Sequence, residues 1–440
     1  MEEIRLINYR CFSDLSVEFK PGINLLIGDN ASGKTTVLQA LCSAMSSFFV
    51  GYSDENTRFI GIGNNDFTQY ATDDDSIINE KPVIIKFLSS EYIDNLEDMM
   101  PCSINELKRE SKKTRTQTKG IGGYKSYSKR LYDTLFDWDT KKQTFSLPLF
   151  AAFSTEDIHS KRKLNAQLFK KYYQKPSFGY YECLQGDGFF PYWIKRLLVL
   201  AEGDKAIKEV EEVRKALQRA LGNGGCNIIT DMSVRPNQGK VYYHFTDGRE
   251  VEAENLSDGY KRLVNMITDL AFRCMLLNKG IYGSDACERT SGTVLIDEID
   301  LHLHPSLQSV ALNGLQRAFP KLQFIVTTHA PMVMSGIEPK KENMVYKLSY
   351  MPEKGYQMFP VQTYGLDVST IVEMILGQTP RTKEIQEKLN RLFNHIDDDQ
   401  YQEAKALLDD MRQQFGENLP ELAKATAMLN FLKDSGNEED

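Results

Sequence analysis

The sequence lacks the features of a membrane or secreted protein. It contains no apolar run of about eighteen residues, which a membrane-spanning helix needs. Its first residues have no basic segment followed by an apolar one, so they do not resemble a secretion signal. The 7 cysteines are scattered, without a C-x-x-C pair. We therefore expect a cytoplasmic protein with free thiols, without a disulfide framework, a zinc site or a membrane partner.

The sequence also lacks an overall positive charge. Its net charge of −8 argues against binding of a polyanion by the whole chain, but it does not exclude a local basic patch. Residues 108–130 carry nine Lys and Arg residues against Glu110 alone, with Tyr124 and Tyr127 between them. Such a run is more often a solvated, mobile loop than a contact for nucleic acid or a partner, and we expect the loop.

A glycine-rich motif at residues 28–35 is the most informative stretch that is present. It fits G-x-x-x-x-G-K-[ST], follows a short buried strand expected at 23–27 and precedes an expected helix at 36–42. Glycines let backbone N–H groups approach a phosphate, and the helix N-terminus adds partial positive charge. Lys34 can reach the β- and γ-phosphates, and the Thr35 hydroxyl can ligate Mg²⁺. The predicted phosphate cradle comprises Gly28, Asn30, Ala31, Ser32, Gly33, Lys34, Thr35 and Thr36.

Two adjacent acids end a second apolar strand, expected at residues 293–296. A core strand seldom ends in this way without a cation nearby, because a buried carboxylate needs a partner. Asp297 is placed to hold the Mg²⁺ shell. Glu298 is placed to polarise a water for attack on the γ-phosphate, so we predict it as a catalytic residue.

Residues 255–260 precede an expected helix from Arg262 to Leu277. Ser257 can cap this helix, and Gly259 allows close backbone approach. The helix start would then be a second dipole facing a phosphate. The alternative is a plain helix cap, which is the commoner meaning of Ser-Asp-Gly before a helix.

His329 follows an expected strand at residues 324–328. Its side chain could hydrogen-bond the γ-phosphate or the attacking water, although a lone histidine after a strand is usually structural. Its place one strand after the two acids favours a catalytic role.

The pair His302 and His304 has the H-x-H spacing of a metal chelate. We reject a metal site, because no third Cys or His lies nearby and the preceding acids are assigned to Mg²⁺. A contact with a partner subunit is the better interpretation.

Taken in chain order, four motifs resemble those of an ABC-type ATPase of the SMC, RecF and OLD class. They are the phosphate cradle, L-S-D-G-Y at 256–260, L-I-D-E-I-D-L-H-L-H-P at 295–305 and T-T-H-A-P at 327–331. The resemblance implies an α/β fold: an ABC-type P-loop NTPase head with a mixed sheet and flanking helices, a helical insertion and a helical C-terminal tail. It also implies ATP and Mg²⁺ as ligands.

The same resemblance implies a head-to-head homodimer or a higher homo-oligomer. Residues 256–259, which we call the signature loop, would contact ATP bound to the other subunit through Ser257, Asp258 and Gly259. Asp258 stands where transporters often have glycine, as SMC-like and defence ATPases allow. Arg10 matches a basic position that often touches nucleotide in this class, and Gln69 is the candidate for the Q-loop ligand of the metal.

The expected domains follow from the extent of the motifs. The N-terminal part of the ATPase domain covers residues 1–90, and a mostly helical insertion with the basic loop covers 91–225. The C-terminal part of the ATPase domain covers 226–365, and a helical tail covers 366–440. The insertion is too short and too poorly patterned in heptads for the long coiled-coil arms of SMC proteins.

The tail resembles that of ATPase subunits from bacterial anti-phage operons, with the Septu systems most similar. This resemblance implies an ATP-hydrolysing subunit of a defence complex that regulates a separately encoded nuclease of the HNH type. DNA is a further candidate partner. Two alternatives stay open: a RecF-like DNA-repair ATPase, and a nucleotide-sensing scaffold with little turnover, against which Glu298 argues weakly.

Overall fold

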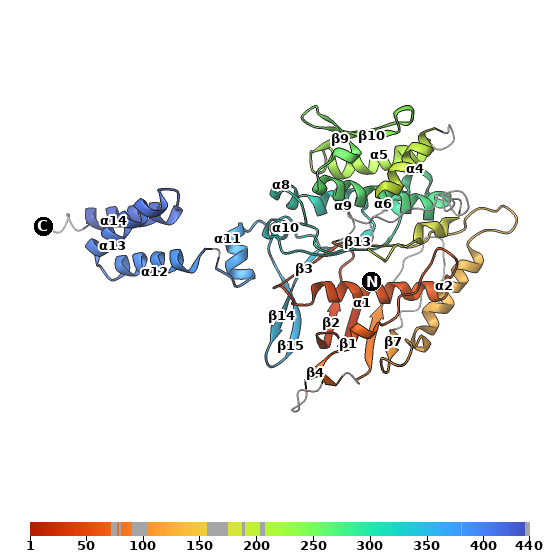
Figure 1. Ribbon diagram of the computed structural model, residues 1–440, viewed down its shortest axis with the longest axis horizontal. Helices are drawn as coiled ribbons and strands as arrows, with labels where there is room; N and C mark the ends of the chain where they lie inside the picture. Colours follow the sequence, from red (N-terminus) through yellow and green to blue (C-terminus); the bar gives the residue numbers. More distant parts are fainter. Residues whose placement is uncertain are drawn as a thin grey trace. The chain divides into compact units, whose positions relative to one another are not determined.

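The computed structural model describes residues 1–71, 77–78, 81–89, 104–155, 175–186, 190–202, 207–379 and 381–435. These residues form two compact units, Met1–Val368 and Ser369–Asp440 (Figure 1). In the described part of the chain, no helix is long and apolar enough to cross a membrane. The described cysteines are free thiols, and Cys102 lies outside the described residues.

The first unit is built around a six-stranded sheet in the order β15-β14-β3-β13-β12-β8. Five of its strands run parallel, and β14 and β15 form an antiparallel hairpin. Because β3 and β13 are buried along their whole length, their sequences are almost entirely apolar. The strands are β3 (Ile23–Ile27), β8 (Leu149–Phe153), β12 (Gly292–Ile296), β13 (Leu322–Thr327), β14 (Met344–Met351) and β15 (Gly355–Val361).

A second, antiparallel sheet has the strand order β2-β1-β6-β7. Helix α1 (Lys34–Ser46) packs against β6 of this sheet and β13 of the central sheet, and Figure 1 shows it between the two layers. Parallel strands place their carboxyl ends at one edge, so the start of α1 lies at the edge where β12 and β13 end. The strands are β1 (Glu3–Tyr9), β2 (Phe12–Glu18), β6 (Val83–Leu88) and β7 (Asn105–Arg109).

Helices cover the other side of the central sheet. The long helix α6 (Asp258–Tyr282) is buried along most of its length, and its buried residues include the charged Arg262, Asp269 and Arg273. It packs against α4 (Phe190–Ala201), α5 (Ile207–Leu221) and α9 (Ala311–Ala318). A three-stranded sheet of β9 (Ile229–Arg235), β10 (Lys240–Phe245) and β11 (Glu250–Glu252) contacts α4 and α5, with a turn at Asp247-Gly248 between β10 and β11.

The region 91–225 is not a separate insertion, which corrects the expected boundaries. It supplies β7 to the antiparallel sheet and β8 to the edge of the central sheet, beside β12. It also supplies the helices α4 and α5, which pack on α6. The sequence does not indicate this arrangement, because β8 pairs with β12, a strand that begins far along the chain at Gly292.

The basic stretch 108–130 is also more ordered than expected. It contains the end of β7, a short 3₁₀ helix at Lys119–Ile121 and most of α2 (Gly122–Thr134). Tyr124 and Tyr127 are buried together with Leu131 on one face of α2. The prediction of a mobile loop was therefore wrong, since apolar positions three and four residues apart fix a helix against the core.

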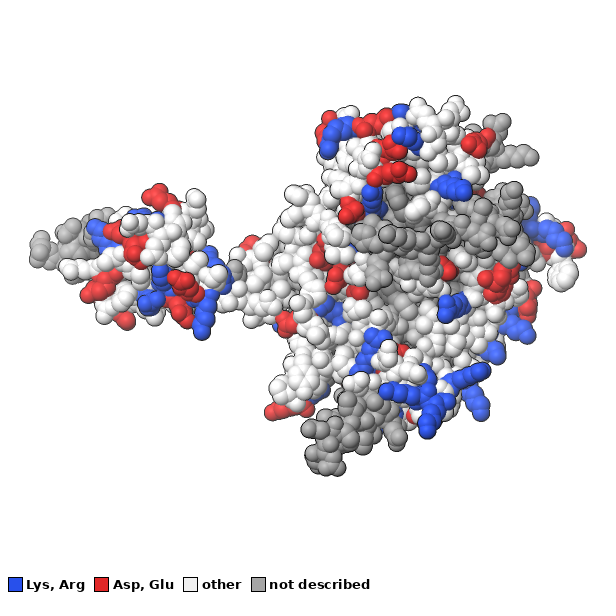
Figure 2. Space-filling view, in the orientation of Figure 1, with Lys and Arg blue, Asp and Glu red and all other residues white. Residues whose placement is uncertain are grey.

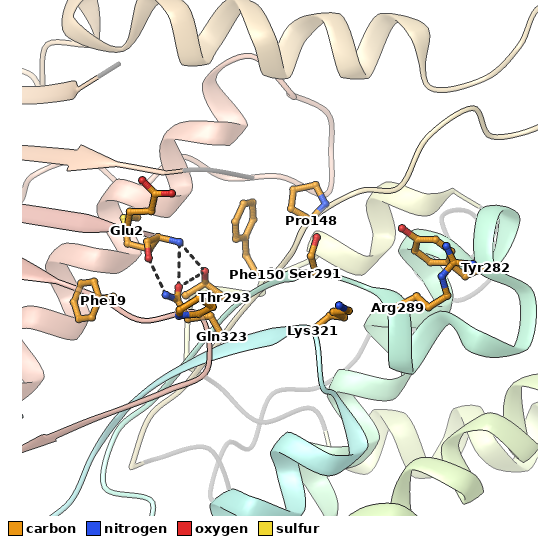
Figure 3. Close-up of a pocket in the computed structure, with 13 residues that line it drawn as sticks. Glu2, Phe19, Pro148, Phe150, Tyr282, Arg289, Ser291, Thr293, Lys321 and Gln323 are labelled. Atoms are coloured by element: carbon orange, nitrogen blue, oxygen red, sulfur yellow. Dashed lines mark hydrogen bonds between the residues drawn. The ribbon is translucent and has the colours of Figure 1, made fainter. Parts of the chain in front are cut away.

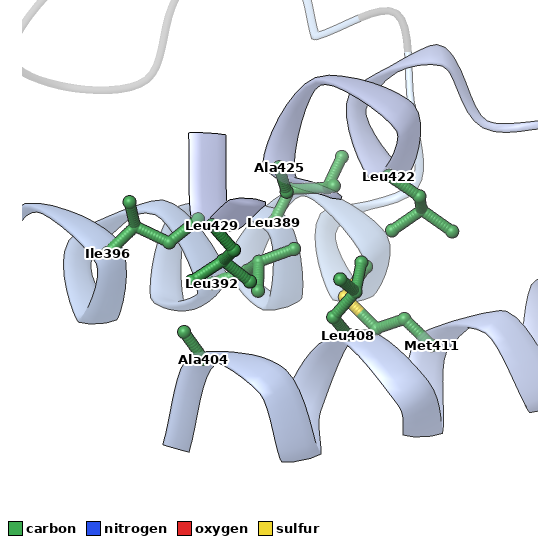
Figure 4. Close-up of a cluster of buried hydrophobic side chains, with 9 residues drawn as sticks. All are labelled: Leu389, Leu392, Ile396, Ala404, Leu408, Met411, Leu422, Ala425 and Leu429. Atoms are coloured by element: carbon green, nitrogen blue, oxygen red, sulfur yellow. The ribbon is translucent and has the colours of Figure 1, made fainter. Parts of the chain in front are cut away.

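The second unit contains three long helices among its described residues: α12 (Lys383–Asp397), α13 (Tyr401–Phe415) and α14 (Pro420–Ser435). Their inward faces share one apolar cluster, including Leu392, Leu408 and Leu422 (Figure 4). Arg381 pairs with Glu421 at 2.6 Å. The described part of this tail is helical and has an apolar core of its own.

Candidate nucleotide-binding site

The loop between β3 and α1 needs glycine at both ends. Gly28 has φ +149°, and a side chain there would collide with the carbonyl oxygen of Leu348. Gly33 has φ +99°, and an added Cβ would lie 2.5 Å from a ring carbon of Phe12. The loop is therefore held closely between β14 and the turn from β1 to β2, in a conformation that other residues rarely adopt.

Within the loop, the backbone turns its N–H groups into a concave surface. Ala31 has φ +62°, and the N–H of Ser32 donates to the carbonyl of Asp29 at 3.2 Å. Asn30 and Ala31 are exposed. Alternating right- and left-handed residues of this kind form a nest for an anion, and α1 begins directly behind it.

Lys34 is buried at the start of α1. Its Nζ donates to the carbonyl oxygens of Gly28 at 2.9 Å and Asp29 at 2.8 Å. Burial lowers the pKa of the Lys34 ammonium, and the negative charges of Asp29, Glu298, Asp297 and Asp300 oppose this by favouring the charged form. The cation thus lies on the rim of the nest and faces the acids that follow β12.

The Thr35 side chain, in the first turn of α1, contacts that of Asp297, which directly follows β12. The Thr35 hydroxyl donates to the two carboxylate oxygens of Asp297 at 3.1 and 3.0 Å. Thr327, at the end of β13, donates its hydroxyl to the same carboxylate at 2.6 Å. A hydroxyl and a carboxylate are hard oxygen ligands that suit Mg²⁺, which takes only one or two protein carboxylates. No group of three or more His, Cys, Asp or Glu able to hold a metal occurs among the residues described.

Glu298 has a constrained backbone beside this pair. Its φ is +48°, which a residue other than glycine seldom adopts and which often marks a functional site. Its N–H donates to the Thr327 hydroxyl at 2.8 Å. The guanidinium of the fully buried Arg262 donates to the carbonyl of Glu298 and, at 2.6 Å, to that of Asp297. The peptide carrying both acids is thereby fixed from two sides.

Thr327 and Arg262 were missed by the sequence analysis, as was Asp300. The Asp300 carboxylate accepts from the Thr328 hydroxyl at 2.5 Å and from the backbone N–H of His329 at 3.4 Å. Asp300 therefore positions the segment that carries His329. An acid three residues after Asp297 was the available signal, whereas Arg262 is one of several polar residues in α6 and did not stand out.

The signature loop begins α6, with Ser257 at the N-cap position. The predicted cap was wrong, because the Ser257 side chain makes no hydrogen bond to the helix. Ser257 and Asp258 are exposed. Gly259 is buried, and a side chain there would collide with the carbonyl oxygen of His302. The start of α6 thus packs directly against the segment that follows the two acids.

The two remaining predicted ligands, Arg10 and Gln69, have different surroundings. Arg10 pairs with Asp66 at 2.8 Å and lines a hollow of about 630 Å³ beside α1, together with Gln39 and Asn64. Gln69 is exposed, and in the described structure no hydrogen bond joins it to Thr35 or Asp297. The structure therefore does not bring Gln69 to the predicted metal ligands.

The two histidines of the H-x-H pair are exposed. The Nδ1 of His304 lies 3.3 Å from the Ser306 N–H and caps the short helix at Pro305–Gln308.

A hollow of about 550 Å³ lies at the opposite edge of the central sheet (Figure 3). Thr293 and Gln323, near the amino ends of β12 and β13, line it and are joined by a hydrogen bond of 3.0 Å. Since the phosphate cradle follows the carboxyl end of β3, this hollow is separate from the nucleotide site.

Comparisons with known proteins agree with this geometry. The family model described as "AAA domain, putative AbiEii toxin, Type IV TA system" matches residues 23–335, and the chain belongs to this family. The "Retron Vc95 probable ATPase" of Vibrio cholerae serotype O1 biovar El Tor is 24% identical over 80% of this chain and 74% of that protein. The "Septu protein PtuA" of Bacillus thuringiensis is 21% identical over 86% and 84%.

Two further matches are shorter or weaker. The "DNA replication and repair protein RecF" of Alkaliphilus oremlandii (strain OhILAs) is 44% identical, but over only 12% of this chain and 16% of that protein. A solved SMC head bound to the C-winged helix domain of ScpA aligns with a TM-score of 0.46 and 13% identity, covering 82% of this chain and 98% of that one. The matches to sequences confirm that the chain is an ABC-type ATPase by class, related to retron ATPases, Septu PtuA and RecF.

Proposed function

We propose that this chain binds ATP with Mg²⁺, hydrolyses it, and serves as the ATPase subunit of a bacterial anti-phage defence complex. One observation carries the enzymatic part. Thr35 and Asp297, 262 residues apart in the sequence, form hydrogen bonds of 3.1 and 3.0 Å at the mouth of the phosphate cradle. Two metal ligands therefore meet where the β- and γ-phosphates would lie.

Each residue of the site has a role that its position allows. The nest and Lys34 would bind the phosphates, and Thr35 and Asp297 would hold Mg²⁺, which supplies charge neutralisation on the phosphates when bound. The Glu298 carboxylate accepts a proton from the attacking water as general base. His329 donates a hydrogen bond towards the γ-phosphate. Arg262 and Asp300 position these groups without touching the nucleotide.

The relatives support a role in defence. The sequence similarity to a retron ATPase and to Septu PtuA extends over most of the chain, whereas the sequence similarity to RecF is confined to a short segment. We therefore favour control of a separately encoded nuclease, of the HNH type, over DNA repair.

The exposed start of α6 supports a paired arrangement of two copies of the chain. Ser257 and Asp258 face solvent, and the Ser257 hydroxyl makes no cap hydrogen bond. The first N–H groups of a helix of 25 residues suit a phosphate presented by a second copy of the chain. A two-fold interface would place two ATP molecules between cradle and signature loop.

Phosphate release by the purified chain tests the enzymatic proposal. Release should require ATP and Mg²⁺, and it should be lost in Asp297→Asn, which keeps the size of the side chain but weakens the metal site. The exposed Asp285→Asn is a matched control and should behave as wild type. Release that continues with a chelator in excess would refute the proposal. Copurification with the product of the neighbouring gene, followed by a nuclease assay with and without ATP, tests the partner.

A further inference from the structure

A basic surface lies on the first unit outside the nucleotide site. Residues 111–132 contain seven Lys and Arg residues and no acid, in a chain of net charge −8. Helix α2 holds its cations at the surface. Tyr124, Tyr127 and Leu131 are buried on one face of the helix, and the cations lie on the opposite face. In Figure 2, Lys and Arg side chains gather over the positions that β7 and α2 occupy in Figure 1. The exposed cations of this surface are Lys112, Lys113, Arg115, Lys119, Lys125, Lys129 and Arg130.

Several of these cations have no carboxylate to satisfy them. Lys113, Arg115, Lys119, Lys125 and Lys129 form no ion pair with any residue that the structure describes. Lys125 and Lys129 are four residues apart, so they lie on the same side of α2. Cations without ion pairs along the turn after β7 and along α2 suit a ligand with many negative charges better than a single carboxylate.

An exposed tryptophan follows directly after α2. Trp138 is 82% exposed, and the Lys141 ammonium lies 5.3 Å from the centre of its ring. A turn presents it, in which the Asp137 carboxylate accepts from the Thr140 N–H at 2.6 Å and the Asp137 N–H donates to the carbonyl of Lys142 at 2.9 Å. The turn is anchored to α6, because Gln143 donates to the carbonyl of Leu277 at 2.8 Å. Trp138 is thus displayed on a fixed support.

We propose that this surface binds single-stranded nucleic acid, with the α2 cations along the phosphates and a base stacked on Trp138. Aromatic rings bind unpaired bases because every base has a π-face, whereas bases in a duplex are already stacked. Tyr124 and Tyr127 are buried, and Trp138 is about twice as exposed as Tyr132 and Phe136, so Trp138 is the main stacking group. Asp133 and Asp139 flank Trp138, so most of the electrostatic attraction comes from the row between Arg115 and Lys129. The proposal does not depend on ATP hydrolysis.

The sequence offers a direct reporter, since the chain has 2 tryptophans. Trp193 is 3% exposed and stacked on Phe272 at 4.7 Å, so it is shielded from added ligands. In Trp193→Phe, emission comes from Trp138 alone. A single-stranded oligonucleotide of about 16 nucleotides, the upper end of common site sizes, should quench this emission saturably. DNA and RNA of one sequence, the matching duplex and inorganic phosphate are the other arms.

Charge variants complete the test. Lys113→Glu with Arg115→Glu should weaken binding of the single strand about tenfold or more and lower the salt slope by about 1.4, for two lost phosphate contacts. Trp138→Ala should weaken binding about tenfold. The double variant Lys321→Glu with Lys341→Glu is the control. It makes an equal change of charge at exposed positions near the amino ends of β13 and β14 and should leave binding unchanged.

Three outcomes would overturn the proposal. They are no quenching by either single strand, an unchanged salt slope in the Lys113 and Arg115 variant, and equal quenching by inorganic phosphate. Binding of the duplex as tight as that of the single strand, with no effect of Trp138→Ala, would also refute the stacking.

Discussion

At the scale of single residues, Lys34 and Thr35 could be predicted because their roles depend on neighbours close in the sequence. The motif contains the glycines, the lysine and the hydroxyl within eight positions, so spacing alone places them on one loop. The contacts of Thr327, Asp300 and Arg262 depend on how β12, β13 and α6 pack together, and this packing cannot be read from the sequence. Gln69 was chosen by its place between motifs, which says nothing of its distance from Asp297.

Removal of the Lys34 ammonium should weaken nucleotide binding. The cation lies among carbonyls and carboxylates and would give a charge-assisted contact to the phosphates. Loss of such a contact costs about 1.5–3 kcal/mol, so Lys34→Ala should lower ATP affinity about tenfold or more. Calorimetry measures this, with the exposed Lys321→Ala as the control. An unchanged affinity would contradict the assignment of the phosphate cradle.

Glu298→Gln should separate binding from turnover. The amide keeps the size of the side chain and cannot take up a proton, so hydrolysis should slow by about 10²-fold or more while ATP stays bound. Single-turnover phosphate release and retention of labelled ATP measure the two effects, with the exposed Glu342→Gln as the control. If Glu298→Gln turned over ATP at the wild-type rate, another residue would have to be the base.

At the scale of secondary-structure elements, α6 links the exposed signature loop to the half-buried acids Asp297 and Glu298. Its first turn packs on the carbonyl of His302 through Gly259, and Arg262 reaches the carbonyls of Asp297 and Glu298 one turn later. A displacement of the helix start would therefore move the peptide that carries the acids. The sequence predicted the helix and the apolar strands, because their periodicity is local. It did not predict that β8 joins the same sheet, because strand order depends on contacts distant in sequence.

Arg262→Lys should slow turnover more than it weakens ATP binding. Lysine keeps the charge, but its ammonium cannot reach both carbonyls, so the acids lose their support and a buried carbonyl is left unsatisfied, at about 1–3 kcal/mol of stability. Steady-state kinetics should show a lower kcat with little change in KM.

Arg273→Lys provides the matched control for this variant. Arg273 is buried on the same helix but pairs with Asp269 at 2.6 Å, away from the acids. Its replacement should lower the thermal unfolding temperature in a similar way and leave the kcat of the folded protein unchanged. Equal kcat values for the two variants would show that Arg262 has no positioning role.

At the scale of the whole molecule, the residues that we propose to act on ATP are divided between two surfaces of the first unit. Lys34, Thr35, Asp297 and Glu298 gather at the carboxyl ends of the strands, whereas Ser257 stands exposed at the start of α6. The sequence predicted both surfaces through their motifs. The structure differs from the prediction of a separate insertion, since β7 and β8 pair with strands of the ATPase sheets. The motifs could still be recognised despite the wrong boundaries, because each motif depends only on residues close together in the sequence.

Complementation between two inactive variants tests whether the two surfaces meet in a dimer. Lys34→Ala removes the phosphate contact on one side, and Ser257→Arg blocks the signature loop on the other. Each variant alone should be inactive, because every composite site would contain a damaged half. A mixed dimer contains one site with both halves intact, so an equimolar mixture should recover part of the ATPase rate. Subunit exchange is confirmed separately by mass measurement of tagged copies. If exchange occurs and the mixture stays inactive, hydrolysis does not depend on a signature loop supplied by the second copy.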